Sequence, residues 1–132
     1  MVKNIRYLMA GILLVGSTLS YANMDKCIKL NSQTELNKCA TQSLSIVEGQ
    51  IGRVYQKYLK ELNDREQNQL RESQRLWVQF KEKDCAFEAS PVKGGSMHSY
   101  VLSACLIDRT EKRITELENM MNCSNGTEPS CL

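Results

Sequence analysis

A single stripe of apolar residues between Thr34 and Asn63 constrains the fold of this chain more than any other feature. Its members follow one another at steps of three or four residues, the period of one face of an α-helix. They are Leu36, Ala40, Leu44, Val47, Ile51, Tyr55, Tyr58 and Leu62. Ser32 and Glu35 form a capping box that would begin the helix. Such a helix would be roughly 45 Å long at 1.5 Å per residue, so other helices must pack along it.

Two more long helices are expected to follow. Asp64, with Gln67 at the reciprocal position of a capping box, predicts a second helix that ends near Ala89. Its core side is expected to hold Leu70, Leu76, Trp77, Phe80 and Phe87. A proline and two glycines in residues 90–96 interrupt the helical pattern. A third helix is expected over residues 97–121, with Leu102, Leu106, Thr110, Ile114, Leu117 and Met121 on one face.

The sequence therefore predicts an all-α fold. No segment shows the sustained two-residue alternation of a half-buried strand. Short connections favour antiparallel neighbours, so we expect a disulfide-stapled antiparallel bundle of three long helices over residues 23–121, or a long hairpin with the third helix laid against it. Residues 122–132 contain glycine, proline and serine, and are expected to form an irregular tail.

Residues 1–22 have the three parts of a cleavable signal peptide. Lys3 and Arg6 precede an apolar run over residues 7–15, and small residues stand at positions −3 and −1 of a cut after Ala22. The run is shorter than the roughly 20 residues that span a bilayer. No cysteine directly follows the small residues, so we expect neither a lipid anchor nor a membrane anchor after cleavage, and a periplasmic or secreted product.

The charge balance argues against two classes of partner. The chain has 17 basic and 15 acidic residues, and the signal peptide takes two basic residues, Lys3 and Arg6, with it. The remainder is neutral and has no basic field of the kind that binds nucleic acid or anionic lipid.

All six cysteines follow the signal peptide, and in an oxidising compartment an even number predicts disulfides. Six cysteines allow 15 pairings, but the expected order of helices ranks them. Cys85 and Cys105 flank the loop between the second and third helices. An irregular N-terminal segment would bring Cys27 back to Cys39, and Cys123 would pair with Cys131. The long spacings and the single histidine do not fit a zinc site, and no metal or other cofactor is expected.

Two glycines and several polar residues lie on the helices without forming a catalytic pattern. Gly49 and Gly52 interrupt the first helix at a cost of about 1 kcal/mol each relative to alanine; we expect them to admit a close neighbouring helix or to mark a bend, with a binding role as the alternative. Trp77 is interpreted as core rather than a ligand platform. Arg109 and Arg113, near Thr110, are expected to form a buried polar network. No nucleophile with a base and no converging carboxylates are visible, so we expect no enzyme.

The loop after the second helix is the candidate partner-binding site. Lys93, Ser96 and His98 place a cation, a hydroxyl and an imidazole beside two glycines. Rigid loops on helical scaffolds commonly carry recognition residues. The alternative is that this segment only makes a turn and caps the next helix.

Residues 70–85 resemble the signature L-x-x-x-Q-x-x-W-x-x-[FY]-[RK]-x-x-x-C of the lysozyme inhibitor LprI-like, N-terminal domain family. The later pattern C-x-x-x-x-T-x-x-R-x-x-x-L is also present. The matching residues are Leu70, Gln74, Trp77, Phe80, Lys81, Cys85, Cys105, Thr110, Arg113 and Leu117. Cys27 and residues 35–39 also resemble the family's opening. In the first helix the chain departs from the family's D-x-x-L-N-x-x-Y, because it has Glu48, Ile51, Gly52 and Tyr55 there.

The resemblance implies a bacterial periplasmic or surface protein. The leading hypothesis is a non-catalytic protein that binds and blocks a lysozyme-like muramidase. The alternatives are an immunity protein against a cell-wall-degrading toxin and a structural or assembly factor of the envelope that binds another periplasmic partner.

Overall fold

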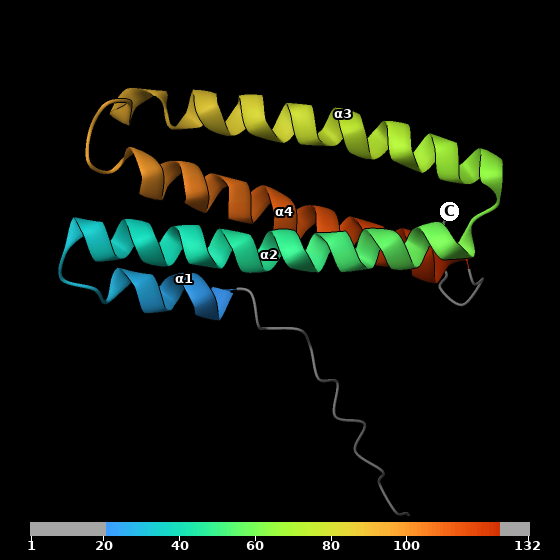
Figure 1. The fold of residues 1–132 in the computed structure, drawn as a ribbon, viewed down its shortest axis with the longest axis horizontal. Coiled ribbons are helices and arrows are strands. Elements are labelled where there is room, and N and C mark those ends of the chain that lie inside the picture. Colours follow the sequence, from blue (N-terminus) through green and yellow to red (C-terminus); the bar gives the residue numbers. More distant parts are fainter. Residues whose placement is uncertain (1–20, 125–132) are drawn as a thin grey trace, which may run out of the picture.

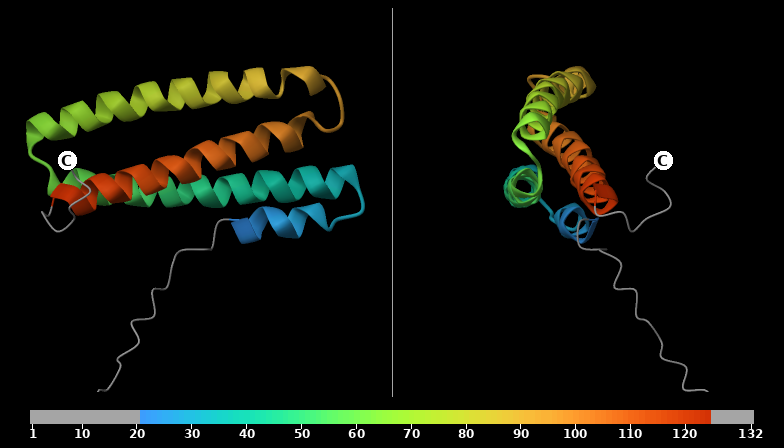
Figure 2. Two further views of the ribbon diagram at one scale, coloured as in Figure 1. Left: turned by 180° about the vertical axis from the view of Figure 1, so that it is seen from behind. Right: turned by 90° about the vertical axis from the view of Figure 1, so that its right-hand side faces the viewer.

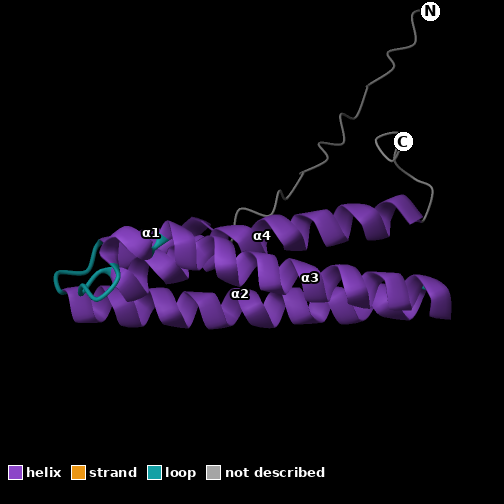
Figure 3. Ribbon diagram, turned by 90° about the horizontal axis from the view of Figure 1, so that it is seen from above, coloured by secondary structure: helices purple, strands orange, loops and turns teal. Residues whose placement is uncertain are grey.

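The computed structural model describes residues 21–124, and within that range the fold is all-α, as predicted. Four α-helices follow one another, α1 (Tyr21–Ile28), α2 (Gln33–Glu61), α3 (Asp64–Glu88) and α4 (His98–Ser124), with a short 3-10 helix, η1 (Ser90–Val92), before α4. The described residues contain no strand (Figure 3).

The three long helices run up, down and up, but they do not pack in that order. α2 and α4 run in the same direction and pack along each other, while α3 runs antiparallel to both and lies against α4 (Figures 1 and 2). The expectation that helices adjacent in sequence would be the main packing neighbours is therefore wrong for α2 and α3. The short link at Leu62 and Asn63 joins their ends and leaves α3 free to pack against α4.

Helix starts follow local capping chemistry. Ser32 caps α2 as expected, its Oγ accepting a hydrogen bond from the Glu35 amide at 3.2 Å. α3 is capped one residue earlier than predicted, by Asn63 rather than Asp64. The Asn63 Oδ1 accepts from the Glu66 amide at 3.0 Å, and the Glu66 carboxylate accepts from the Asn63 amide at 3.1 Å. Glu66 thus takes the role assigned to Gln67, because this reciprocal pair satisfies two backbone donors.

The two ends of the domain are more helical than expected. The segment predicted to be irregular around Cys27 is α1, and Cys27 is fully buried and bonded to Cys39 of α2. At the other end, α4 continues to Ser124 instead of ending near residue 121. The predicted tail beyond residue 124, with Cys131 and its expected bridge to Cys123, lies outside the described residues.

The apolar core sits where α2, α3 and α4 meet. Its buried members are Ile51, Leu59, Leu70 and Leu117, and partly buried residues packed against them are Val54, Tyr55, Tyr58, Leu62, Trp77 and Ile114. Leu117 is fully buried. This core joins residues far apart in the sequence, so it fixes the mutual placement of the three long helices.

The predicted core side of α3 is only half right. Leu70 is buried and Trp77 packs on the core, but Leu76, Phe80 and Phe87 are 51%, 58% and 79% exposed. Lys81 is buried instead, at 6% exposure. Phe80 is turned by about 60° from Trp77 around the helix axis, away from α2, whereas Lys81 stands about 40° to the other side. Because apolar periodicity does not count lysine, the sequence pattern could not indicate that Lys81 belongs to the contact face of α3.

Neither glycine of α2 admits a neighbouring helix. A methyl group added at Gly52 would meet no heavy atom within 4 Å, and one at Gly49 would have Arg53 of the same helix as its nearest neighbour, at 3.5 Å. The expectation of a close helix approach at these positions is therefore wrong.

Replacing Gly52 by alanine should raise the free energy of unfolding by about 1 kcal/mol, because alanine loses less backbone entropy in a helix and meets no obstacle here. Urea unfolding measures the change. Gly94→Ala is the control, since the φ of +83° at Gly94 strains any other side chain and should make that variant less stable. A Gly52→Ala protein no more stable than the parent would contradict this view of α2.

Candidate partner-binding site

The candidate loop, residues 89–97, lies at one end of the bundle between α3 and α4, at the left in Figure 1. Its backbone makes a chain of tight turns. The amide of Lys93 donates to the Ser90 carbonyl at 3.2 Å, that of Gly95 to Val92 at 2.9 Å, and that of His98 to Gly95 at 3.2 Å. These bonds leave few free amides and give the loop a defined conformation.

The backbone geometry of the loop explains why glycine occupies positions 94 and 95. Gly94 has a φ of +83°, in the left-handed region that favours glycine. At Gly95 an added methyl carbon would lie 3.2 Å from the Val92 carbonyl oxygen. The sequence 93–96 is therefore suited to this turn.

Two cross-links tie the loop to the helices. The disulfide Cys85–Cys105, one of the pairings expected from the order of the helices, joins α3 to α4 with 5.5 Å between the Cα atoms. On the opposite side, the Asn37 side-chain amide of α2 donates to the Ser96 carbonyl at 2.8 Å, and Gln33 donates to the Asn37 side chain at 2.8 Å. The loop is thus attached to three helices.

The three residues singled out from the sequence share this loop but do not form a bonded cluster. Lys93 and Ser96 are exposed, and His98, the first residue of α4, is half-buried. Within residues 21–124, no hydrogen bond or ion pair joins their side chains to one another or to other residues. Their polar atoms are available to a partner.

The residues that carry the family signature lie elsewhere, on the contact between α3 and α4. The Lys81 ammonium lies 3.4 Å from the Thr110 hydroxyl, 3.7 Å from a Glu48 carboxylate oxygen of α2, and 5.0 Å from the centre of the Trp77 ring. Thr110 is fully buried and donates to the Leu106 carbonyl at 2.7 Å. These contacts join all three long helices around one buried cation.

Arg113 continues the same contact by one turn of α4. Its guanidinium donates to Gln74 at 3.2 Å and to Ser73 at 3.1 Å, both on α3, and lies 6.0 Å from the Trp77 ring centre. Its side chain is 11% exposed. The single buried network expected of Arg109, Thr110 and Arg113 is not formed in the described residues. Each of the three side chains bonds to α3 separately, and no hydrogen bond joins them to one another. In this chain the signature residues thus hold α3 on α4.

Arg109 joins α4 to α3 at the end of their contact that lies nearest the candidate loop. It donates to Asp84 at 2.9 Å and to Glu88 at 3.2 Å on α3. The hydrogen bond to Asp84 is the main reason that the pKa of Arg109 is raised. Burial favours a higher pKa for Asp108, but hydrogen bonds from Lys112 and Arg109 hold the pKa of this carboxyl below its ordinary value. Both ionised groups are stabilised in the folded chain.

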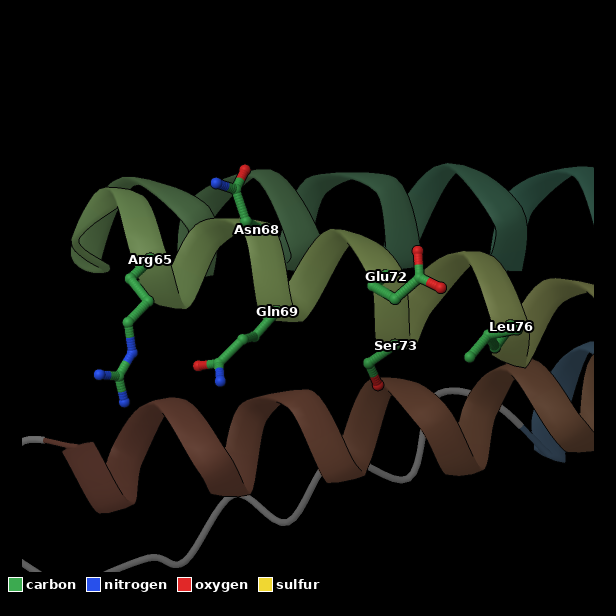
Figure 4. A pocket seen from close by; sticks show the side chains of 6 residues that line it. All are labelled: Arg65, Asn68, Gln69, Glu72, Ser73 and Leu76. Carbon is green, nitrogen blue, oxygen red and sulfur yellow. The ribbon is translucent and has the colours of Figure 1, made fainter.

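A second surface, missed from the sequence, runs along α3. Besides the exposed Leu76, Phe80 and Phe87, the helix borders an open groove of about 730 Å³ (Figure 4), lined by Arg65, Asn68, Gln69, Glu72, Ser73 and Leu76. The signal that could have found it is a second line of residues at steps of three and four, separate from the line through Gln74 and Trp77.

Residues 21–124 include no group of three or more histidine, cysteine, aspartate or glutamate side chains placed to hold a metal ion. None of the helices described there combines the length and apolar character needed to cross a membrane.

Comparison with known proteins identifies the relatives of this chain. The sequence model of a family described as "Lysozyme inhibitor LprI" matches residues 24–117. The chain is also 30% identical over 113 residues to an uncharacterized protein of Rhizobium meliloti (strain 1021). The aligned region covers 76% of this chain and 81% of the Rhizobium protein. No solved structure matches the chain. The family match begins at Met24 in α1, extends over α2, α3 and the loop, and continues into α4 as far as Leu117.

Proposed function

Because this chain belongs to the lysozyme inhibitor LprI family, we propose that it is a non-catalytic protein that binds and inhibits a lysozyme-like cell-wall hydrolase. Hydrolases of this kind act through two carboxylates in a cleft. An inhibitor can block such a cleft by presenting hydrogen-bond donors to those acids on a rigid element.

The loop of residues 89–97 supports this proposal most directly. It is closed by the Cys85–Cys105 disulfide and by the Asn37 hydrogen bond, so little conformational entropy is lost when a partner binds. Lys93 and His98 supply nitrogen donors and Ser96 a hydroxyl, and their side chains have no bonds to other described residues. In this proposal these three groups contact the carboxylates and the rim of the cleft.

Inhibition of peptidoglycan hydrolysis by lysozymes of several structural types tests the proposal. The purified chain from residue 23 onward should inhibit at least one of them with one molecule bound per enzyme. A protein that neither binds nor inhibits any of them would refute the proposed function.

Triple replacement of Lys93, Ser96 and His98 by alanine should raise the inhibition constant at least about tenfold, since each removed charge-assisted bond is worth about 1.5–3 kcal/mol. The matched control replaces three exposed residues of α2, Ser45, Gln56 and Lys57, and should leave the inhibition constant unchanged. Equal inhibition by the triple variant and the parent would remove the loop residues from the proposal.

Export belongs to the same proposal. The signal peptide of residues 1–22 would deliver the chain to the oxidising compartment in which its disulfides form. Cleavage after Ala22 would remove the first two residues of α1 and leave Cys27 in place. N-terminal sequencing of protein recovered from a bacterial periplasm should begin at Asn23, and recovery of the uncut chain would contradict the assignment.

A further inference from the structure

The exposed side of α3 presents one continuous line of residues. Leu76, Phe80, Lys83 and Phe87 follow at steps of four, three and four, so they project from the same side of the helix. We call these four residues the α3 ridge. Its N-terminal end adjoins the groove of about 730 Å³, of which Leu76 is one wall (Figure 4). Its C-terminal end, Phe87, is in the last full turn before η1 and the candidate loop.

The apolar members of the ridge are unusually exposed for their size. Phe80 and Phe87 are 58% and 79% exposed, and Leu76 is 51% exposed. Single exposed apolar residues are common, but three large ones in line on one helix are typical of a protein-binding surface. The neighbouring side of α3, roughly 110° around the helix axis, holds the contacts of Trp77 and Lys81 with α2 and α4. The ridge lies beside that contact face, and the exposure of its side chains shows that it is not a contact surface among the described residues.

Lys83 gives the ridge a specific charge pattern. Arg75 is ion-paired with Glu72 on the same helix, and Arg109 is ion-paired with Asp84 and Glu88. Lys83 is exposed, and no ion pair or hydrogen bond connects it to another residue of the described chain. It stands between two phenyl rings that are about 10 Å apart along the helix axis at 1.5 Å per residue. The ridge thus presents a cation with an aromatic group on each side.

This pattern is complementary to the substrate cleft of a glycan hydrolase. Such a cleft holds two carboxylates, and the surfaces beside them accept the apolar faces of sugar rings. A phenyl ring can occupy such a surface, and a lysine between two rings is placed to meet the carboxylates. Aromatic side chains on a rigid helix also lose little entropy on binding and are frequent among hot-spot residues.

We propose that the α3 ridge enters the substrate cleft of the inhibited hydrolase, with Lys83 facing one of the two carboxylates and Phe80 and Phe87 on the sugar-binding surfaces, while the loop of residues 89–97 presents its donors to the other carboxylate and to the rim. This inference rests on the proposed function and names the surface that performs it. It also gives a role to the three large apolar residues of α3 that are exposed, Leu76, Phe80 and Phe87.

Three single variants test the ridge by their inhibition constants against a lysozyme that the parent inhibits. Phe80→Ala and Phe87→Ala should each raise the inhibition constant about tenfold, as for aromatic hot-spot residues. Lys83→Glu should raise it further and make the remaining inhibition stronger at high salt, since repulsion between carboxylates is screened. Ile46→Ala and Lys57→Glu on the outer side of α2 are the matched controls and should inhibit like the parent. Circular dichroism verifies that each variant is folded.

The outcomes distinguish the proposed role of the ridge from the proposed function of the protein. If the parent inhibits and all three folded ridge variants inhibit equally well, the role of the ridge is refuted and the proposed function remains. If the parent does not inhibit, both are refuted.

Two further results would also refute the role of the ridge, provided that inhibition is unchanged. One is loss of self-association in Phe80→Ala, measured by sedimentation. The other is binding of soluble glycan strands that depends on the ridge residues.

Discussion

Replacing Lys81 by glutamate should lower the free energy of unfolding by about 3–5 kcal/mol, because it leaves a carboxylate buried without a partner. The new group would stand where the ammonium now meets the Thr110 hydroxyl and the Glu48 carboxylate, under the Trp77 ring. Repulsion from Glu48 replaces attraction there. Urea-induced unfolding followed by circular dichroism measures the loss.

Two further substitutions show whether the loss of stability in Lys81→Glu comes from the buried charge. Lys81→Met keeps the length of the side chain and its packing on Trp77, and Glu48 is half exposed and can remain hydrated, so stability should change by less than about 1.5 kcal/mol. Lys83→Glu reverses the same charge at an exposed position of the same helix and should change stability by less than about 0.5 kcal/mol. Equal losses for Lys81→Met and Lys81→Glu would show that the ammonium itself, rather than its packing, stabilises the helix contact.

Removing the Cys85–Cys105 disulfide, by serine at both positions, should lower the free energy of unfolding by about 3 kcal/mol in the chain-entropy treatment of a loop of this length. The larger consequence is expected in binding. Without the disulfide, the loop of residues 89–97 is held by its own turns and by Asn37, so a partner must order it on binding. The inhibition constant should therefore rise even at temperatures where the variant is fully folded.

The other described disulfide provides the control. Replacing Cys27 and Cys39 by serine should cost a similar amount of stability, about 3 kcal/mol, because the loop lengths are comparable. This disulfide fastens α1 to α2 and not the candidate loop to its helices. Inhibition by the folded variant should match the parent. If both double variants inhibited equally well, rigidity of the loop would have no part in binding.

Local chemistry made the helices predictable. The start of α2 at Ser32 and the interruption at residues 90–96 follow from capping, proline and glycine, which act within a few residues. The Cys85–Cys105 and Cys27–Cys39 pairings followed from the order of the elements. The shift of the α3 cap from Asp64 to Asn63 shows the limit of such reasoning, since two overlapping capping boxes one residue apart cannot be ranked by residue type alone.

Packing between helices was less predictable, and α3 shows why. Apolar spacing assigned Phe80 to the core, but the buried position belongs to Lys81, whose ammonium is paired with the Glu48 carboxylate of α2 and hydrogen-bonded to the Thr110 hydroxyl of α4. Partners so far away in the sequence leave no local signal. The packing of α2 along α4 likewise joins residues that are far apart in the sequence. The helical segment containing Cys27 has only eight residues, and a helix this short is marginal by itself, so it depends on the Cys27–Cys39 disulfide and on packing against α2 rather than on a local signal.

The candidate site was also predictable only in part. Its loop is indicated by the two glycines and the flanking cysteines, and the structure adds the hydrogen bond from Asn37. The roles of the signature residues Trp77, Lys81 and Arg113 could not be predicted, because a sequence pattern does not say whether its members contact a partner or one another. The structure assigns them to the contact between helices. In the proposed function, binding therefore falls to surface residues outside that contact, on the loop and along the α3 ridge.

Competition with an oligosaccharide tests most directly the claim that this chain occupies a hydrolase cleft. A lysozyme that the chain inhibits is titrated with the chain at increasing concentrations of a soluble chito-oligosaccharide that fills the cleft, and binding is measured by calorimetry. Occupation of the cleft predicts that no ternary complex forms and that the apparent dissociation constant rises linearly with the free concentration of the oligosaccharide, without reaching a plateau. An unchanged dissociation constant at full saturation would place the contact elsewhere on the enzyme and contradict the account.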